Sequence, residues 1–446
     1  MKKYMLIIVW AFLFAAGAIA QETLSLAECR QRALEHSQAI KSAQSSMKSA
    51  DIEHKLSKRA LLPNLDFNAG YHYMADPKLM AIPGHVLPTT QGTLSGVYSP
   101  PFTKNLTYQN SYEATISMSL PLYLGGKLNY ARQIAAKSKE ISQSNVELGE
   151  TGVLLQIEQQ YWTLVSLLEH KKLAQNSVAF LDKVCKDVNN LYENGIVTKN
   201  QVLKTEVERN NAKLFLLTVS DNIEIIKMSI NQLIGNDIDT NFFVKDSVIQ
   251  ISESEAELAF NPDYLGNRNE IKILSRQIDI NKTLQKMVRS DHLPQLVSFA
   301  NYTLQSINHL GKDEKEFTWN AGLSLSIPIF HWGEIRLRRQ QAKLATESIG
   351  FTLDRTKELL SLEIKQAIFN LKEAYTKLEF TKDALLQSEE NLHLETNRLK
   401  QQVGNTTDLL NAQLQWQKAH TDFIAAKVEV KIQQMLYKKA IGELNL

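Results

Sequence analysis

The sequence predicts a mostly α-helical protein with a β-barrel part, built as two copies of one unit. The stretch SMSLPLYLGGKLNYARQ (117–133) returns as SLSIPIFHWGEIRLRRQ (324–340), 207 residues later. Proline is absent from 122–261 and from 329 to the end, as expected for long helices, because proline breaks a helix interior. Four short segments instead alternate apolar and polar residues with the period of two that is typical of strands.

The start of the chain is typical of a secretory signal peptide. Two lysines precede an apolar stretch, 5–16, which leads to an A-x-A cleavage pattern at 18–20. The alternative, a stop-transfer helix, needs about 20 apolar residues to span a bilayer. We therefore expect residues 1–20 to be removed and the mature chain to begin at Gln21. Because Gln21 is not a cysteine, no lipoprotein anchor is indicated.

Composition excludes several classes of function. The chain has 50 Lys and Arg against 48 Asp and Glu, and two of the lysines lie in the signal, so no excess basic charge is left to attract nucleic acid. Cys29 and Cys185 are too few and too far apart for a disulfide framework or a metal site. We find no P-loop, nucleophile elbow, H-E-x-x-H or paired-carboxylate motif. No cofactor is expected, and an enzyme is the weakest hypothesis.

The repeat keeps one register over more than a hundred residues. At the offset of 207, Pro121 matches Pro328 and Gly126 matches Gly333. The tract 191–204 likewise matches 398–411. Upstream the offset becomes 231, so 24 extra residues lengthen a loop within 75–110. We expect four parts: a signal (1–20), a first repeat (21–235), a connector (236–261) and a second repeat (262–446).

Each repeat is expected to hold a long helical hairpin. In the second copy leucines recur every seven residues, at Leu371, Leu378, Leu385, Leu392 and Leu399. In the first copy Leu181, Val184 and Val188 have the spacing of a coiled-coil seam. A helix over 127–192 would be about 100 Å long at about 1.5 Å per residue. A returning helix should follow the turns near Gly195 and Gly404.

The four short segments fit transmembrane strands. They are LDFNAGYHY (65–73), YEATISMSL (112–120), TWNAGLSLSI (318–327) and the less regular LVSFANYTL (296–304). Strands of about 9–11 residues with one apolar face suit a barrel in lipid, although a half-buried soluble sheet shows the same alternation. Tyr71, Tyr73, Tyr112 and Trp319 could form an interfacial girdle or simply pack on the sheet. Since about eight strands are the fewest that close a membrane barrel, four require several copies: two would give eight strands and three would give twelve.

The residues above resemble a known family in their order and their duplication. The carriers are ALEHSQAIKSAQ (33–44), the two strand-Pro-x-x-x-x-Gly joins, GIVT (195–198) and DLLNAQ (408–413). The whole mature chain thus resembles TolC-type outer-membrane efflux proteins. The resemblance implies a homotrimer in the lipid of the Gram-negative outer membrane, with a twelve-strand barrel continued by a twelve-helix periplasmic tunnel.

The same resemblance implies the function and the partners. An inner-membrane pump and a periplasmic adaptor would deliver substrates to a passive exit duct, in tripartite efflux or type I secretion. The joins where barrel becomes tunnel would be Pro121, Gly126, Pro328 and Gly333. There the proline would end the strand's hydrogen-bond ladder and the glycine would permit the turn.

Family members place acidic residues just inside the periplasmic mouth. Asp408 matches the first acid of the family's D-x-L-D-A tract, Asn411 stands where the second acid is usual, and Gln201 occupies the matching site in the first copy. A ring of carboxylates would attract cations and resist closure, so this reduced set predicts a weaker cation preference. Alternatively, Asp408 is a helix N-terminal acid that faces the macrodipole.

The tips of the hairpins are expected to contact the adaptor. The candidate residues are Gly195, Thr198, Gly404 and Thr407. Plain turn and N-cap roles compete with this interpretation. Gly404 lies four residues before Asp408, against six in the family motif, and Gln402 fills the usual glycine position. We therefore expect the second tip to differ in shape from the first.

Two rival hypotheses remain open. A periplasmic coiled-coil adaptor or scaffold would bind a pump without spanning a membrane, but it has no reason for four alternating segments. Charged substitution at Ile116 or Leu325 would then leave localisation unchanged. Metal export is suggested by His72, Met74, Met80 and His85 around the first loop. These residues lack the spacing of metal ligands.

Overall fold

The computed structural model describes residues 22–75, 79–87, 97–105, 110–245, 249, 251, 261–309, 312–401 and 403–444. The expected signal peptide, Gln402 and part of the long first loop lie outside the described residues. The chain divides into two units. The helical unit comprises 1–48, 140–276 and 350–446, and the sheet unit comprises 49–139 and 277–349.

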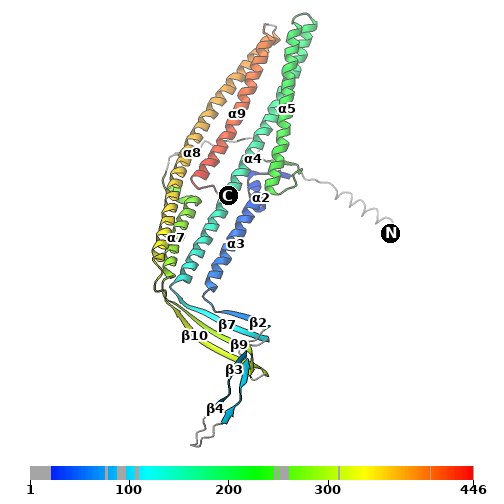
Figure 1. Cartoon of the computed structure of the whole chain (residues 1–446). Helices are drawn as coiled ribbons and strands as arrows, with labels where there is room; N and C mark the ends of the chain where they lie inside the picture. Colours follow the sequence, from blue (N-terminus) through cyan, green and yellow to red (C-terminus); the bar gives the residue numbers. More distant parts are fainter. Residues whose placement is uncertain are drawn as a thin grey trace, which may run out of the picture. The chain divides into compact units, whose positions relative to one another are not determined.

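Most of the described chain is helical, as predicted (Figure 1). The helices are α2 (Leu26–His36), α3 (Gln38–Arg59), α4 (Lys127–Glu193), α5 (Lys199–Ile234), α6 (Tyr264–Asn267), α7 (Asn269–Ser290), α8 (Glu334–Lys400) and α9 (Thr406–Ala440). Both α4 and α8 have 67 residues, and the helix expected over 127–192 is confirmed. Within the described ranges, no helix is both long enough and apolar enough to cross a bilayer.

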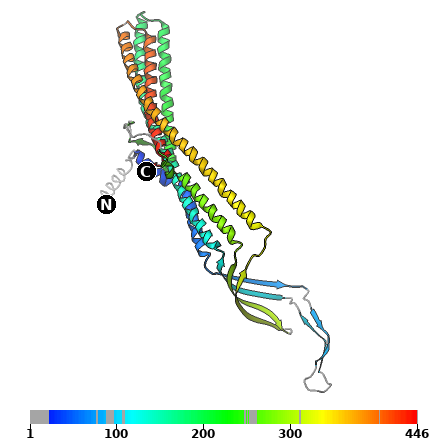
Figure 2. The same ribbon diagram turned by 90° about the vertical axis from the view of Figure 1, so that its left-hand side faces the viewer.

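The strands form one principal sheet and three small pairs. They are β1 (Glu22–Leu24), β2 (Asn64–Tyr73), β3 (Leu79–Ile82), β4 (His85–Leu87), β5 (Val97–Ser99), β6 (Phe102–Asn105), β7 (Asn110–Leu124), β8 (Phe242–Val244), β9 (Gln295–His309) and β10 (Lys312–Ser326). The principal sheet is antiparallel in the order β10-β9-β7-β2, so all four expected strands lie in it (Figure 2). Ribbons β3–β6 and β4–β5 occupy part of the lengthened first loop.

Except in β9, the register places the alternating apolar residues of the strands on one face of the sheet. Leu65 pairs with Met118, Ile116 with Tyr302 and Tyr302 with Trp319. The opposite face is polar: the Thr115 and Thr303 hydroxyls lie 3.0 Å apart, and Asn301 donates to Asn320 at 3.0 Å. The large apolar side chains, among them Leu65, Phe67, Ile116, Trp319, Leu323 and Leu325, are exposed in the single chain. A one-residue slip would invert both faces, so this alternation fixes the register.

The irregular strand β9 has a local explanation. Phe299 lies on the polar face, directly opposite Gly322 of β10. A Cβ added to Gly322 would lie 3.0 Å from Cζ of Phe299, so the ring covers the space that a side chain would fill. An aromatic that covers a cross-strand glycine is a recognised way to hold register. The irregular alternation of β9 is therefore explained by the pairing of Phe299 with Gly322 across the strands.

In the helical unit, α4 with α5 and α8 with α9 form two antiparallel hairpins (Figure 1). Of the predicted seam residues, Leu181, Val184, Val188 and Leu371 are buried, whereas Leu378, Leu385, Leu392 and Leu399 are half-buried. The main core surrounds Tyr161 of α4, which is fully buried. Helix α2 begins with a capping box, in which Ser25 and Glu28 exchange hydrogen bonds, and its buried Cys29 and Ala33 join this core.

Candidate functional site

The first hairpin turns at a glycine tip. Gly195 has φ of +74°, a left-handed conformation that glycine adopts without a Cβ clash. The N–H of Ile196 donates to the carbonyl of Leu191 at 2.9 Å and closes the end of α4. Thr198 is the N-cap of α5, with φ −86° and ψ 157°. Its side chain accepts no capping hydrogen bond from the described residues, so the hydroxyl has no capping role.

The second tip is built differently, as expected. The carbonyl of Arg398 accepts hydrogen bonds from both Val403 and Gly404, at 3.1 and 3.0 Å. A Cβ on Gly404 would lie 2.8 Å from the backbone nitrogen of Leu399, so this glycine permits a close backbone approach. Asn405, rather than a threonine, caps α9 by accepting from the N–H of Thr407 at 3.0 Å.

The two tips contact each other within the helical unit. Their shared core consists of Val184, Val188, Val202 and Leu409. Beside it, the hydroxyl of buried Thr406 donates to Oε1 of Gln201 at 3.3 Å. Nζ of Lys204 donates to the hydroxyl of Thr407 at 3.4 Å. Gln201 and Thr407 are therefore both held in the contact between the hairpins.

The other two aperture candidates lie on the open side of α9. Asp408 is in the first turn, and Asn411 is exposed one turn later. Spacing of three places both side chains on one helix face. Asp408 also has the position required by the alternative interpretation, because an acid in the first turn of a helix interacts favourably with the helix dipole. The structure thus groups Asp408 with Asn411, whereas Gln201 contacts Thr406. Their aperture role stays a prediction.

The first join between strand and helix departs from expectation at its proline. Pro121 pairs with Val297 inside β7, and the strand continues to Leu124 after a bulge between Pro121 and Tyr123. The prediction that Pro121 ends the ladder is therefore wrong. Pairing of β7 with β2 stops at Ser119, and a bulge tolerates the missing N–H of proline. Gly126 has φ of +85° and makes the turn, as expected.

The second join keeps the expected order. Strand β10 ends two residues before Pro328, and Gly333 has φ of +79° immediately before α8. Trp332 precedes it with φ of +47°, at the position that Gly125 occupies in the first copy. This is the one non-glycine residue with positive φ among the described residues. His331 also stacks on His292, with ring centroids 5.4 Å apart.

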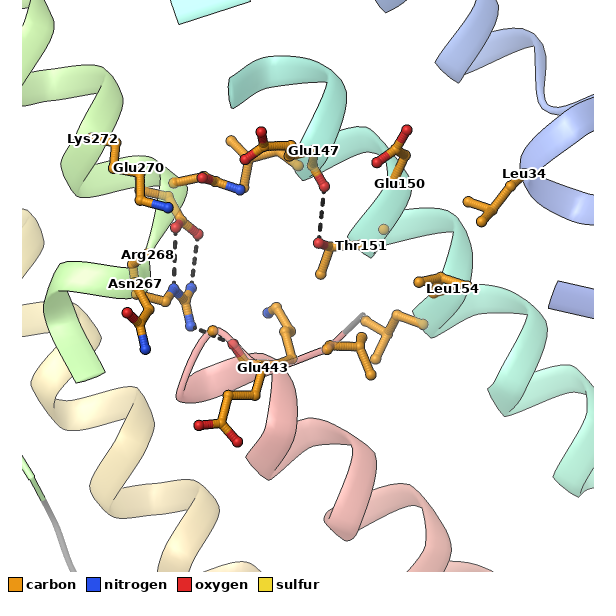
Figure 3. Close-up of a pocket in the computed structure, with 17 residues that line it drawn as sticks. Leu34, Glu147, Glu150, Thr151, Leu154, Asn267, Arg268, Glu270, Lys272 and Glu443 are labelled. Carbon is orange, nitrogen blue, oxygen red and sulfur yellow. Dashed lines mark hydrogen bonds and ion pairs between the residues drawn. The ribbon is translucent and has the colours of Figure 1, made fainter. Parts of the chain in front are cut away.

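A buried arginine contacts three helices, α7, α8 and α9, beside a cavity of about 720 Å³ (Figure 3). Arg268, only 4% exposed, donates at 3.0 Å to the carbonyls of Lys439 and Ala440 at the end of α9. It also pairs with Glu270 at 2.7 Å and with Glu363 at 3.1 Å. Burial opposes the charge of Arg268, but the two carboxylates outweigh it and raise its pKa. The same pairing lowers the pKa of Glu270 against its own burial. This group fixes helix ends and has no catalytic geometry.

A second buried polar group lies between α4 and α9. Lys427 pairs with Glu169 at 2.5 Å, and both side chains are largely buried. Burial lowers the pKa of His170 and of His420, and the charge of Lys427 lowers both further; His420 also lowers the pKa of His170. The carboxylates that raise these values are Glu169 for both histidines and Glu389 of α8 for His420. Two neutral imidazoles therefore pack across the two hairpins.

Sequence reasoning missed both buried groups because their members come from distant segments and share no local motif. Of the residues that suggested metal export, His72 lies in β2, Met80 in β3 and His85 in β4, and the side chains of Met80 and His85 lie outside the described part of the structure. In the part of the chain that the structure describes, no three His, Cys, Asp or Glu side chains could hold a metal ion.

A profile of the outer membrane efflux protein family matches residues 29–236 and 264–443, which include both hairpins and the four-stranded sheet. The chain belongs to the outer membrane efflux protein family. This efflux protein is therefore a Gram-negative outer-membrane protein that extends into the periplasm. Family members and structural neighbours are channels rather than enzymes.

The efflux protein is 21% identical over 264 residues to the cobalt-zinc-cadmium resistance protein CzcC of Cupriavidus metallidurans, a match that covers 57% of this chain. It spans 60% of the length of that relative. Among solved structures, the Campylobacter jejuni CmeC outer membrane channel has a TM-score of 0.76 at 18% identity, and covers 94% of this chain and 85% of that one. The Vibrio cholerae outer membrane protein VceC has a TM-score of 0.71 at 16% sequence identity, and the match covers 94% of this chain and 96% of that one. These similarities show a shared fold.

Proposed function

We propose that this efflux protein is the exit duct of a tripartite efflux or type I secretion system. It passively conducts substrates that an inner-membrane pump delivers through a periplasmic adaptor. The observation that carries the proposal is the four-stranded sheet, which has one apolar face, one polar face and two outer strands, β2 and β10. Such a sheet suits lipid on one side and water on the other, provided that its edges are closed by further copies.

Three copies explain the sheet better than two. An eight-strand barrel has an interior that its own side chains fill, so two copies would leave no passage. Three copies give twelve strands and a lumen lined by the polar face, including Thr115, Asn301 and Asn320. The duct is therefore a homotrimer in which β10 of one protomer pairs with β2 of the next.

Helices α5 and α8 support the same assembly. In α8, Leu362, Phe369 and Phe380 are exposed, each two positions from a seam residue. Two positions correspond to about 200° around a helix, so α8 is apolar on two opposite faces. In α5, Leu203, Val207, Leu214, Leu217 and Ile225 are exposed in the same way. Helices that are apolar on two sides are normally enclosed on both, and neighbouring protomers would enclose these.

The two halves act as duplicated repeats, 21–235 and 262–446, joined by the connector 236–261. Their matching hairpins, with helices of 67 and 36 residues against 67 and 35, support this division. On this arrangement the periplasmic mouth lies at the tips. Asp408 and Asn411 would line the aperture, while the tip residues Gly195, Thr198, Gly404 and Thr407 would face the adaptor.

Paired substitutions on adjacent residues of β7 test the duct. Ile116→Arg puts a charge on the apolar face, where an arginine at the bilayer midplane costs about 2–4 kcal/mol, and should abolish outer-membrane insertion. Ser117→Arg, the matched control on the polar face, should insert and lower conductance in planar bilayers. A soluble periplasmic monomer with both variants unchanged would instead support the adaptor or scaffold alternative.

A further inference from the structure

The segment that links β10 to α8 exposes an unusual amount of apolar surface. Ile329 is 93% exposed and Trp332 is 90% exposed, and Ile327 and Phe330 are exposed as well. The Phe330 and Trp332 rings contact each other, with centroids 5.0 Å apart. Trp332 has φ of +47°, a left-handed conformation that is unfavourable for a residue with a Cβ. A conformation of this kind points to a use for the indole.

This exposed surface continues the apolar face of the sheet. Leu323 and Leu325 of β10 alternate onto Ile327 and Ile329 in steps of two, past the last paired residue, Ser326. In an outer-membrane protein that extends into the periplasm, the end of β10 that joins α8 is the periplasmic end. The Phe330–Trp332 pair therefore follows the edge of the lipid-facing surface, where tryptophan is favoured because its ring is amphipathic.

Helix α8 then begins with basic side chains on one face. Trp332, Arg336, Arg339 and Lys343 follow the spacing i, i+4, i+7 and i+11. Arg338 pairs with Glu334 at 2.5 Å. Arg336 and Arg339 are exposed, and no carboxylate among the described residues lies within ion-pair distance of either one. The first copy offers only Arg132 at these two positions, since Asn129 matches Arg336.

The depth of these arginines matches that of lipid phosphates. At about 1.5 Å per residue, Arg336 and Arg339 lie about 3 and 7.5 Å along the helix from Glu334. The headgroup region adds about 5–8 Å to each side of the hydrocarbon core. Guanidinium groups bind phosphate through paired hydrogen bonds. Lys343 lies a further turn beyond this layer.

We propose that residues 327–339 bind an anionic phospholipid of the periplasmic leaflet, with Phe330 and Trp332 at the interface and Arg336 and Arg339 on the headgroup phosphate. A second copy of the chain is the competing occupant. The apolar residues that suit a neighbouring helix, Leu337 and Leu344, lie about 100° around α8 from the basic face. Lipid and neighbour therefore take different faces of α8. The inference requires the outer-membrane location and is independent of any pump or adaptor.

Native mass spectrometry of the detergent-purified, full-length protein tests the headgroup contact with phosphatidylglycerol as the probe and zwitterionic phosphatidylethanolamine as the reference. Arg336→Gln and Arg339→Gln should each weaken phosphatidylglycerol binding about fivefold. A basic residue near an anionic lipid surface contributes about 1 kcal/mol, which corresponds to this factor. The double variant should lose about 30-fold. Arg355→Gln, an exposed arginine about 24 Å further along α8, is the matched control and should change nothing.

Fluorescence of the reconstituted protein tests the interfacial contact. Phospholipids brominated near the headgroup should quench the emission that is lost in Trp332→Phe. If Trp332 is not quenched, and a Trp332→Cys variant instead cross-links to a neighbouring copy, then the second copy covers the segment and the proposal is wrong. Equal loss of phosphatidylglycerol binding in Arg355→Gln would likewise overturn it, because it would reflect net charge alone.

Discussion

Arg268 provides the sharpest test of how the helical unit is held together. Its guanidinium joins the last turn of α9 to Glu270 at the start of α7 and to Glu363 of α8. Arg268→Gln would leave Glu270 and the two carbonyls without their partner, while Glu363 would keep only its pair with Lys439 at 3.0 Å. Breaking a buried pair by removing one member costs about 3–5 kcal/mol. The end of α9 should therefore open locally far more often.

The assay is hydrogen exchange of the α9 amides that precede Ala440, measured on the assembled protein. A local loss of about 3–5 kcal/mol corresponds to exchange that is faster by roughly two to four orders of magnitude. Arg276→Gln is the matched control, because Arg276 pairs with Glu140 at 3.0 Å and is substantially more exposed. That pair should be worth about 1 kcal/mol or less.

The comparison between the two arginines decides the result. If Arg268→Gln accelerates exchange no more than Arg276→Gln, then the buried group does not hold α9 and the reasoning from burial fails. A uniform acceleration over α4, α5, α8 and α9 would show global unfolding, and Arg268→Lys would then separate the loss of the fork-shaped contacts from the loss of charge.

Acid should loosen the packing of α4 against α9. Burial holds the pKa of His170 and of His420 below 6.5, so the unfolded chain binds more protons than the folded chain as the pH falls. The stability that is present above about pH 6.5 is therefore lost as the pH falls through the lowered pKa values. His420→Gln should make the urea midpoint depend less steeply on pH. Asp408→Asn should reduce cation preference, measured as the reversal potential under a salt gradient; an unchanged potential removes Asp408 from the aperture. Leu371→Ala, at a buried seam position, should cost about 2–5 kcal/mol of protomer stability, whereas Phe369→Ala, on the exposed face, should weaken assembly alone. Equal effects on the protomer would contradict the two-seam interpretation.

Local patterns predicted the elements of this fold well. Proline placement and seven-residue spacing indicated α4 and α8, and alternation indicated all four strands of the sheet, because both signals depend on near neighbours. Pro121 was misjudged because the sequence does not show that β2 pairing stops at Ser119, which frees that side of β7. The break in β9 was equally invisible, since Phe299 is explained by Gly322 across the strand pair.

In the candidate site, too, the features that depend on near neighbours in the sequence were predicted, and the contacts between distant residues were not. Gly195 and Gly404 were expected from turn chemistry, and both make the turns, although only Gly195 uses a positive φ. The contact of Gln201 with Thr406 joins residues 205 positions apart, and no spacing rule could predict it. Arg268, His170 and His420 were missed for that reason.

Each unit presents surfaces that a single chain leaves unsatisfied. The sheet unit has two outer strands and an exposed apolar face, and the helical unit has exposed apolar residues on α5 and α8 opposite their buried seams. An unpaired strand edge and a two-faced helix are both aggregation hazards in an isolated protomer. Since the contact between the two tips and the hydrogen bonds of Arg268 form within one chain, the protomer can form its hairpins before it assembles. In the proposed homotrimer, closure of the ring should therefore follow folding of the hairpins and complete the sheet last, because neighbouring copies and lipid would cover the apolar surfaces that remain.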